Sequence, residues 1–256
     1  MNRRTLLDRV GVPALSIALF LLCWQLLSWR VSGDVLPGPL GAVDAVQQAI
    51  DSGYLWTDMW VTSKRIIGAF ALTMTAAIVS GTALGRSPLI ARLFGWWVTF
   101  FASVPSLLVV VIVYLAVGLD DRAAVLAAAI VVWPSVTFNV WQGMRSLDPE
   151  LSEMSRAFGC PSQVTVRRVL FPQTLPFLFA AARGGLSLVW KITIFVELLG
   201  RSSGVGYRIQ FWYSLFNMER VLGVALPFIT LMLLVEFAVL RPVESWLFRW
   251  RRAEAS

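Results

Sequence analysis

The strongly apolar segment Leu175–Leu199 is expected to enter the membrane near Arg183, and two further ionisable side chains, Lys191 and Glu197, lie deeper within it. A charge at the centre of a membrane helix costs at least about 2.5 kcal/mol, so each side chain should face protein or water. A cation that faces water in such a segment would suit an anionic ligand. The alternative is that Lys191 pairs with a buried acid, Glu197 or Glu236. Lys191 and Glu197 are about 240° apart around a helix, so they should not pair directly within it. Glu236, near the end of the last apolar segment, is expected to extend toward Arg241.

A second segment with chemical character, Glu153–Pro172, is polar and basic and lies between apolar segments. Asp148 and Pro149 just before it are typical of a helix start, with an acid as N-cap and proline in the first turn. Gly159 suits a left-handed C-cap, and Pro161 can open a second short helix. Two short helices joined at a glycine would form a compact knob that fits a groove in a partner protein. The alternative is an ordinary basic loop.

Other chemistry has little support in the sequence. The chain has no histidine, which removes the commonest metal ligand and general base. Its two cysteines, Cys23 and Cys160, give no disulfide framework and no metal-ligand spacing. Neither lysine follows a glycine, which excludes a phosphate-binding loop of the form G-x-x-x-x-G-K-[ST]. We therefore expect no catalytic residue, no metal site and no cofactor bound by this chain, and a membrane-embedded enzyme is a poor hypothesis.

The composition indicates that a membrane protein positions these residues. The chain of 256 residues is 57% hydrophobic and 14% charged, and its mean hydropathy is +0.71. These values lie outside the range of soluble domains, so the lipid bilayer is expected to be its solvent. The net charge of +7 is dispersed over the loops between apolar segments. That distribution favours a topology signal, and we expect no nucleic acid as a partner.

Six apolar segments approach the length that spans a bilayer, which is about 20 residues of helix. The predicted spans are Val12–Trp29, Ile66–Leu84, Leu93–Val117, Ala123–Trp141, Leu175–Leu199 and Val221–Leu240. Pro172 and Pro176 are expected to break the chain before the fifth of these. Gly81 and Gly85 have the spacing that lets helices approach closely. Packing within the chain is favoured there over packing between copies.

The basic residues predict the orientation, because they resist translocation across the membrane. They are more numerous inside if both termini and the Glu153–Pro172 segment are cytoplasmic. The inner side then includes the terminal residues Arg3, Arg4, Arg9, Arg249, Arg251 and Arg252. Lys64 and Arg65 fall in an outer loop before the second span.

The first apolar run could instead belong to a signal peptide. Its length, its tryptophans Trp24 and Trp29 and the lack of a small-residue cleavage site favour a retained span. The loop that follows begins with the non-helical Leu36-Pro37-Gly38-Pro39 and continues as a short surface helix around Asp44–Ile50.

The Glu153–Pro172 segment resembles the EAA loop of bacterial ABC-importer permeases. The pattern there is Glu-Ala-Ala, three residues, Gly, nine residues, then Ile-x-Leu-Pro. The spacing is matched here throughout, with Met154 and Ser155 in place of the two alanines, Val169 in place of Ile and Phe171 in place of Leu.

Further motifs extend the resemblance over roughly residues 36–207 to permeases of nitrate, sulfonate and taurine importers. They are Leu36-Pro37-Gly38-Pro39, the stretch 63–70, Ser103-Val104-Pro105, the stretch 143–148, and Glu197 followed by the stretch 203–207.

The resemblance implies an all-α membrane protein with the type I ABC importer permease (MetI-like) fold. Residues 1–256 would form one permease domain, with a cytoplasmic coupling loop at 148–172. The chain would be the inner-membrane permease subunit of an ATP-driven importer for a small, anionic or aromatic solute. Implied partners are ABC ATPase subunits, which use ATP and Mg, an external solute-binding protein, and a second permease copy, with a homodimer favoured.

The resemblance also assigns roles to residues. Glu153, Ser155, Ala157 and Gly159 would contact the ATPase subunit. Independently of the resemblance, the charges of Lys191 and Glu197 inside an apolar segment make a contact with the transport path the hypothesis for these two residues. The alternative function is a secondary transporter coupled to an ion gradient. Such a protein should carry several buried acids or repeated halves, and only Glu197 and Glu236 are candidates here.

Overall fold

The computed structural model is helical throughout the parts of the chain that it describes, residues 11–31 and 35–247. The terminal arginines used to predict the orientation, Arg3, Arg4, Arg9, Arg249, Arg251 and Arg252, lie outside the described residues. The helices that correspond to the predicted spans and loops are α2 (Val12–Arg30), α3 (Pro39–Asp51), α4 (Tyr54–Arg86), α5 (Pro88–Ser103), α6 (Ser106–Val117), α7 (Asp121–Arg145), α8 (Pro149–Ala157), α9 (Ser162–Thr165), α10 (Phe171–Gly200), α11 (Val205–Ser214), α12 (Met218–Leu234) and α13 (Arg241–Leu247). Two π-helical segments, η2 (Val166–Leu170) and η3 (Val235–Leu240), precede α10 and α13.

All six predicted spans are helical, but not all of them have the length and composition of a full span. Among the described residues, four helices qualify alone, and the bent pair α5–α6 gives a fifth if it forms one span. The first apolar segment forms the shorter helix α2. The all-helical class is confirmed, and the count of six is reduced to four or five by this measure.

The third predicted span, Leu93–Val117, is not one straight helix. It breaks at residues 103–105, and the axes of α5 and α6 differ there by 97°. Pro105 has no N–H to donate and disfavours helical geometry at Val104, whose backbone is extended (φ −69°, ψ 128°). The sequence contained this signal in Ser103-Val104-Pro105.

Two other predicted boundaries are wrong. Helix α4 begins at Tyr54, so Lys64 and Arg65 lie inside a helix and not in a loop. Pro172 and Pro176 do not break the chain, because the first lies in the opening turn of α10 and the second is inside that helix. Proline is tolerated in a first turn, and the π-helical turn just before it is a place where a helix can absorb irregular geometry.

The core is the packing of α4, α7 and α10, and it depends on small residues. A Cβ on Gly81 would lie 2.7 Å from the Cβ of Val140, and Gly85 faces Met144 in the same way. Gly185 of α10 approaches Val136 of α7 equally closely. Packing within the chain is therefore confirmed for Gly81 and Gly85.

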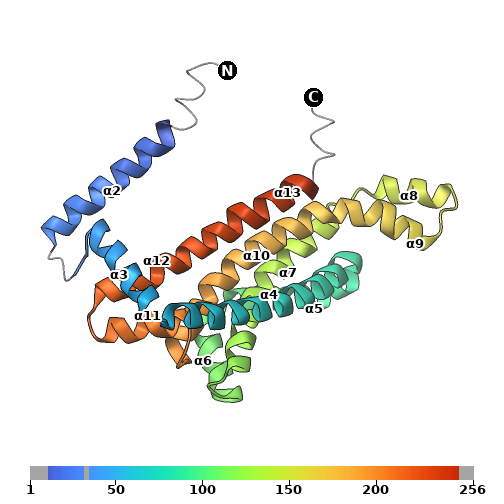
Figure 1. Cartoon of the computed structure of the whole chain (residues 1–256). Helices are drawn as coiled ribbons and strands as arrows, with labels where there is room; N and C mark the ends of the chain where they lie inside the picture. The colour runs from blue at the N-terminus through green and yellow to red at the C-terminus, as the bar shows by residue number, and fades with distance from the viewer. Residues whose placement is uncertain (1–10, 32–34, 248–256) are drawn as a thin grey trace.

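Figure 1 shows how this core separates two ends of the molecule. The pair α8–α9 projects at one end, whereas α3, α6 and α11 gather at the other. Helix α10 contains 30 residues, so at 1.5 Å per residue it connects the two ends over about 45 Å. Helix α2 stands away from the core, and its main packing contact is with α3.

Candidate functional site

The predicted knob is formed by α8, α9 and η2, and its caps are the ones expected from the sequence. The Asp148 carboxylate accepts a hydrogen bond from the Glu150 N–H at 2.9 Å and caps α8. At the other end, Gly159 has φ +64°. The Cys160 N–H donates to the Ser155 carbonyl at 3.0 Å, and the Gly159 N–H donates to the Arg156 carbonyl at 2.9 Å. These two bonds form a Schellman motif, which favours glycine at the left-handed position.

The four residues predicted to contact an ATPase subunit have different environments. Glu153, Ala157 and Gly159 are exposed. Ser155 is only 5% exposed, and its hydroxyl lies 2.7 Å from the hydroxyl of Thr165 in α9. Ser155 therefore holds α8 against α9 and does not present its side chain to a partner. The contact itself stays a prediction for all four residues.

The surface of the knob is suited to a protein partner. Phe158, at the tip, is 79% exposed, and Met154 and Leu151 are also exposed. Glu153 lines a groove of about 450 Å³ between the knob and the ends of α4 and α7. Large apolar side chains on a polar and basic projection mark a protein interaction site more than a solvated loop.

Lys191 lies on an exposed face of α10, in the C-terminal half of the helix. It has no ion pair with any acid in the described part of the chain, so pairing with Glu197 or Glu236 within one copy is not observed. An unpaired cation in an apolar span needs water or another protein surface. Its role in the path stays a prediction.

Glu197 is fully buried and belongs to an ionic network at the end of the molecule opposite the knob. Its carboxylate accepts hydrogen bonds from Arg65 Nη1 at 2.6 Å, from the Thr62 hydroxyl at 2.8 Å and from the Gly206 N–H at 2.9 Å. Arg65 also donates to Asp121 at 2.6 Å and to the Ser203 carbonyl at 2.7 Å. Both charges are thus paired and hydrogen-bonded, as buried charges must be.

The same network fixes the start of α11. Three consecutive N–H groups of Gly204, Val205 and Gly206 donate to Asp58, Thr62 and Glu197 at 3.0, 2.8 and 2.9 Å. Gly204 has φ +104°, and a Cβ there would lie 2.5 Å from the Glu197 carboxylate. The stretch 203–207 therefore carries glycine because its backbone packs directly on a buried acid.

Sequence reasoning missed the α4 side of this network. Asp58, Thr62 and Arg65 follow one another at the i, i+4, i+7 spacing of a single helix face. That signal would have been visible had the second span been started at Tyr54 instead of Ile66.

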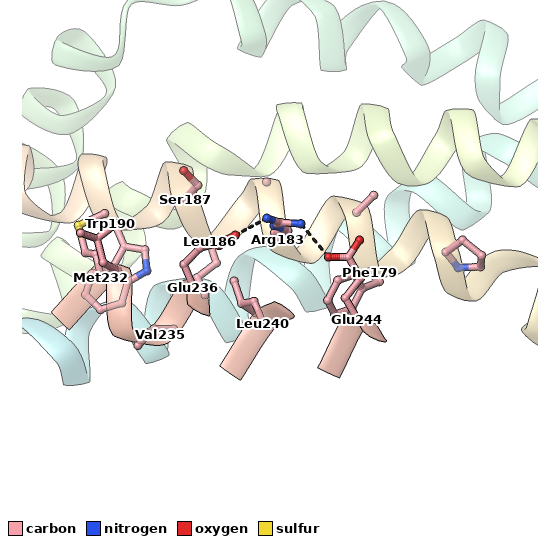
Figure 2. A pocket seen from close by; sticks show the side chains of 14 residues that line it. Phe179, Arg183, Leu186, Ser187, Trp190, Met232, Val235, Glu236, Leu240 and Glu244 are labelled. Carbon is pink, nitrogen blue, oxygen red and sulfur yellow. Dashed lines mark hydrogen bonds and ion pairs between the residues drawn. The ribbon is translucent and has the colours of Figure 1, made fainter. Parts of the chain in front are cut away.

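A cavity of about 750 Å³ lies between α10 and the last helices (Figure 2). Arg183 projects into it and pairs with Glu236 and, at 2.8 Å, with Glu244. Glu236 therefore reaches Arg183, and the expected contact with Arg241 is wrong. The described residues contain no group of three or more His, Cys, Asp or Glu side chains arranged to hold a metal ion.

A comparison with family models matches residues 69–241 to the binding-protein-dependent transport system inner membrane component. The chain is 29% identical over 210 residues to an ABC transporter permease of Brucella melitensis, covering 82% of this chain and 84% of the relative. It is 29% identical to an aliphatic sulfonate transport permease of Escherichia coli, over 72% of this chain and 71% of the relative. It is also 24% identical to a nitrate import permease of Synechococcus elongatus, over 77% of this chain and 75% of the relative.

Solved structures agree on the fold. The permease chain of an inward-facing MetNI methionine ABC transporter superposes with a TM-score of 0.65 at 23% identity, covering 74% of this chain and 96% of that one. The predicted type I, MetI-like architecture is thereby confirmed.

Proposed function

The chain belongs to the family of binding-protein-dependent transport system inner membrane components, and from this we propose that two copies of it form the path of a small anionic or aromatic solute. At the level of the family, it is the multi-pass, non-catalytic permease subunit of a binding-protein-dependent ABC importer in the inner membrane. An ATPase and a solute-binding protein are its partners in that system. Membership of this family excludes the alternative function, a secondary transporter coupled to an ion gradient.

The knob is the coupling element in this proposal, and its exposed tip is the observation that carries the assignment. ATPase subunits bind and hydrolyse ATP with Mg and grip the knob through Phe158 and its neighbours. Because α10 follows η2, the last segment of the knob, without a break, a movement of the knob displaces α10. That displacement opens the path to each side of the membrane in turn, with both termini and the knob in the cytoplasm.

The solute class is inferred from Lys191 and supported by relatives. An exposed, unpaired cation in the apolar span favours an anion. Two of the relatives are named for sulfonate and for nitrate, both of which are anions. A homodimer is favoured because the exposed face of α10 that carries Lys191 requires a cover other than lipid.

The test is a mild-detergent purification of the tagged chain from its native membrane, with partners identified by mass. We expect a stoichiometric ATP-binding subunit. Phe158→Asp should abolish its recovery, because a charge replaces an apolar contact at the tip. Phe216→Asp is the matched control, since Phe216 is 90% exposed but lies after α11, at the other end of the molecule. Recovery of the ATPase with Phe158→Asp at the level of the control would contradict the coupling role.

A further inference from the structure

Helix α7 exposes a stripe of polar side chains that runs from the middle of an apolar span to the end of the helix. Ser135, Asn139 and Gln142 are exposed and recur at the i, i+4, i+7 spacing, so they form one stripe along the helix. None of the three side chains makes a hydrogen bond to another group in residues 11–31 or 35–247. Ser135 lies ten residues before the end of α7, about 15 Å along the axis, so it is at membrane depth.

Lipid is an unfavourable environment for this stripe. An amide or hydroxyl without a hydrogen-bond partner costs several kcal/mol in a hydrocarbon medium, about 4–8 kcal/mol on a cyclohexane scale. Polar residues inside spans therefore face the interior of a bundle or a water-filled cavity. The rest of α7 follows this rule, because Thr137 is fully buried and contacts Ser80 at 3.0 Å. The exposed stripe requires a polar environment outside the single chain.

The stripe faces the same side of the molecule as Lys191. A Cβ on Gly185 would lie 2.8 Å from Val136, and one on Gly143 would lie 2.5 Å from Phe177, so α7 and α10 are antiparallel neighbours. At 100° per residue, the three residues from Val136 to Asn139 turn the helix by 300°, so Asn139 lies about 60° from Val136 in the direction opposite to the helical turn. The six residues from Gly185 to Lys191 place Lys191 about 120° from Gly185, again in the direction opposite to the turn of its own helix. In antiparallel helices these rotations point to one side. One continuous face therefore carries the α7 stripe and the α10 cation.

A cavity of about 390 Å³ on this face gives the stripe the chemistry of a solute site. Ser135 and Asn139 line it from α7, and Thr99 lines it from α5, with apolar walls from Val98 and Phe138. The three polar side chains can all donate a hydrogen bond. Helices α5 and α7 carry no acid except Asp121 at the first position of α7, and the acid of α10, Glu197, is buried. Neutral donors and an apolar wall, with a cation on the same side of the molecule, suit the oxygen atoms and apolar part of a small organic anion.

We propose that Thr99, Ser135 and Asn139 are solute-contact residues of the transport path, and that they donate hydrogen bonds to a small organic anion such as a sulfonate. The assignment rests on the permease function proposed above and adds the residues and the ligand class. Neutral donors hold an anion weakly, and a transport site must release its solute as well as bind it.

The test uses cysteine accessibility in the assembled importer, purified with its ATPase in lipid nanodiscs. The two exposed cysteines, Cys23 and Cys160, are first replaced by serine. Asn139→Cys and, separately, Ser135→Cys are then treated with a charged methanethiosulfonate that reacts only with thiols in water. Val79→Cys is the control, because Val79 is 67% exposed on α4 and turned about 160° from Gly81, which contacts α7.

We expect rapid labelling at Asn139→Cys and Ser135→Cys and no labelling at Val79→Cys. Butanesulfonate should slow the labelling of the first two variants several-fold, whereas butylammonium should not. Absence of labelling in an importer that retains its ATPase would overturn the solute site and leave the permease function standing. Disulfide formation between two Asn139→Cys copies without labelling would likewise overturn it, because the stripe would then be packed against the second copy. Labelling without selective protection by butanesulfonate would overturn the anion class. If one of the two variants, Asn139→Cys or Ser135→Cys, fails to assemble, the other provides the same test, because it lies one helical turn away.

Discussion

Glu197 illustrates what sequence alone can and cannot establish about a single residue. Its place in an apolar segment correctly indicated that it is shielded from lipid. The helical angle also correctly excluded a direct pair with Lys191. Its actual partner, Arg65, is 132 positions away in the chain and was assigned to a loop. Partners at that distance depend on which helices pack together, and no local pattern encodes this.

Replacing Glu197 with glutamine should strongly destabilise the ionic network at the end of the molecule opposite the knob. Arg65 would lose its buried charge partner, and the new amide N–H groups would face the donors of Thr62 and Gly206. Breaking a buried ion pair from one side costs about 3–5 kcal/mol. We expect a clearly lower thermal unfolding midpoint for the assembled permease in nanodiscs, followed by tryptophan fluorescence. Glu219→Gln, at an exposed acid of α12, should leave the midpoint unchanged. Equal midpoints for the two variants would show that the network contributes little to stability.

Gly159→Leu should uncouple ATP hydrolysis from uptake while the chain still inserts. Gly159 has φ +64°, and the left-handed region costs a side chain about 1–2 kcal/mol, so the turn between α8 and α9 should change shape. Gly53→Leu is the matched control, because Gly53 has φ +75° and, like Gly159, has open space around its Cβ position. ATP hydrolysed per solute imported should rise several-fold for Gly159→Leu alone. A normal ratio would remove Gly159 from the coupling element.

At the scale of elements, predictions from local signals were the most successful. The knob was predicted from an N-cap acid, a glycine stop and a proline start, and all three act within one or two turns of helix. Helix boundaries set by tertiary packing were missed. Helix α4 extends twelve residues before the predicted Ile66 because its polar first turns, at Asp58 and Thr62, bind the loop before α11. An analysis of hydropathy assigns such polar turns to a loop.

Ser155→Ala should loosen the knob without changing its surface. The bond between the hydroxyls of Ser155 and Thr165 is the side-chain hydrogen bond that the structure places between α8 and α9, and a hydrogen bond contributes about 1 kcal/mol. We expect several-fold faster amide hydrogen exchange in α8 and weaker retention of the ATPase subunit. Ser162→Ala, at an exposed serine that opens α9, should do neither. Unchanged exchange in α8 would mean that apolar packing alone holds the two helices together.

For the whole molecule, the separation of its two ends fits the coupling role that we propose for the knob and α10. The knob lies at one end, the ionic network fixes α4, α7, α10 and α11 at the other, and α10 runs between them (Figure 1). The network thus provides a rigid end against which α10 can move. The sequence predicted this division of roles only through the resemblance to a family. The face that we propose to line the path could not be predicted, because it depends on the rotation of α7 and α10 relative to each other.

The role of Lys191 depends on the whole assembly, because its ammonium group can contact a solute only if a second surface encloses water around it. Lys191→Met keeps the length and apolar stem of the side chain and removes the charge. We expect the importer to assemble normally with its ATPase but to require about tenfold more anionic solute for half-maximal uptake, equivalent to about 1.4 kcal/mol. Lys64→Met is the control, because Lys64 is the other lysine of the chain and is exposed next to Trp60 in the N-terminal part of α4. If both variants transport a sulfonate probe with unchanged concentration dependence, Lys191 has no part in solute binding. Its charge would then be explained by an acid of the second copy, which a cross-link between the two copies at Lys191→Cys would reveal.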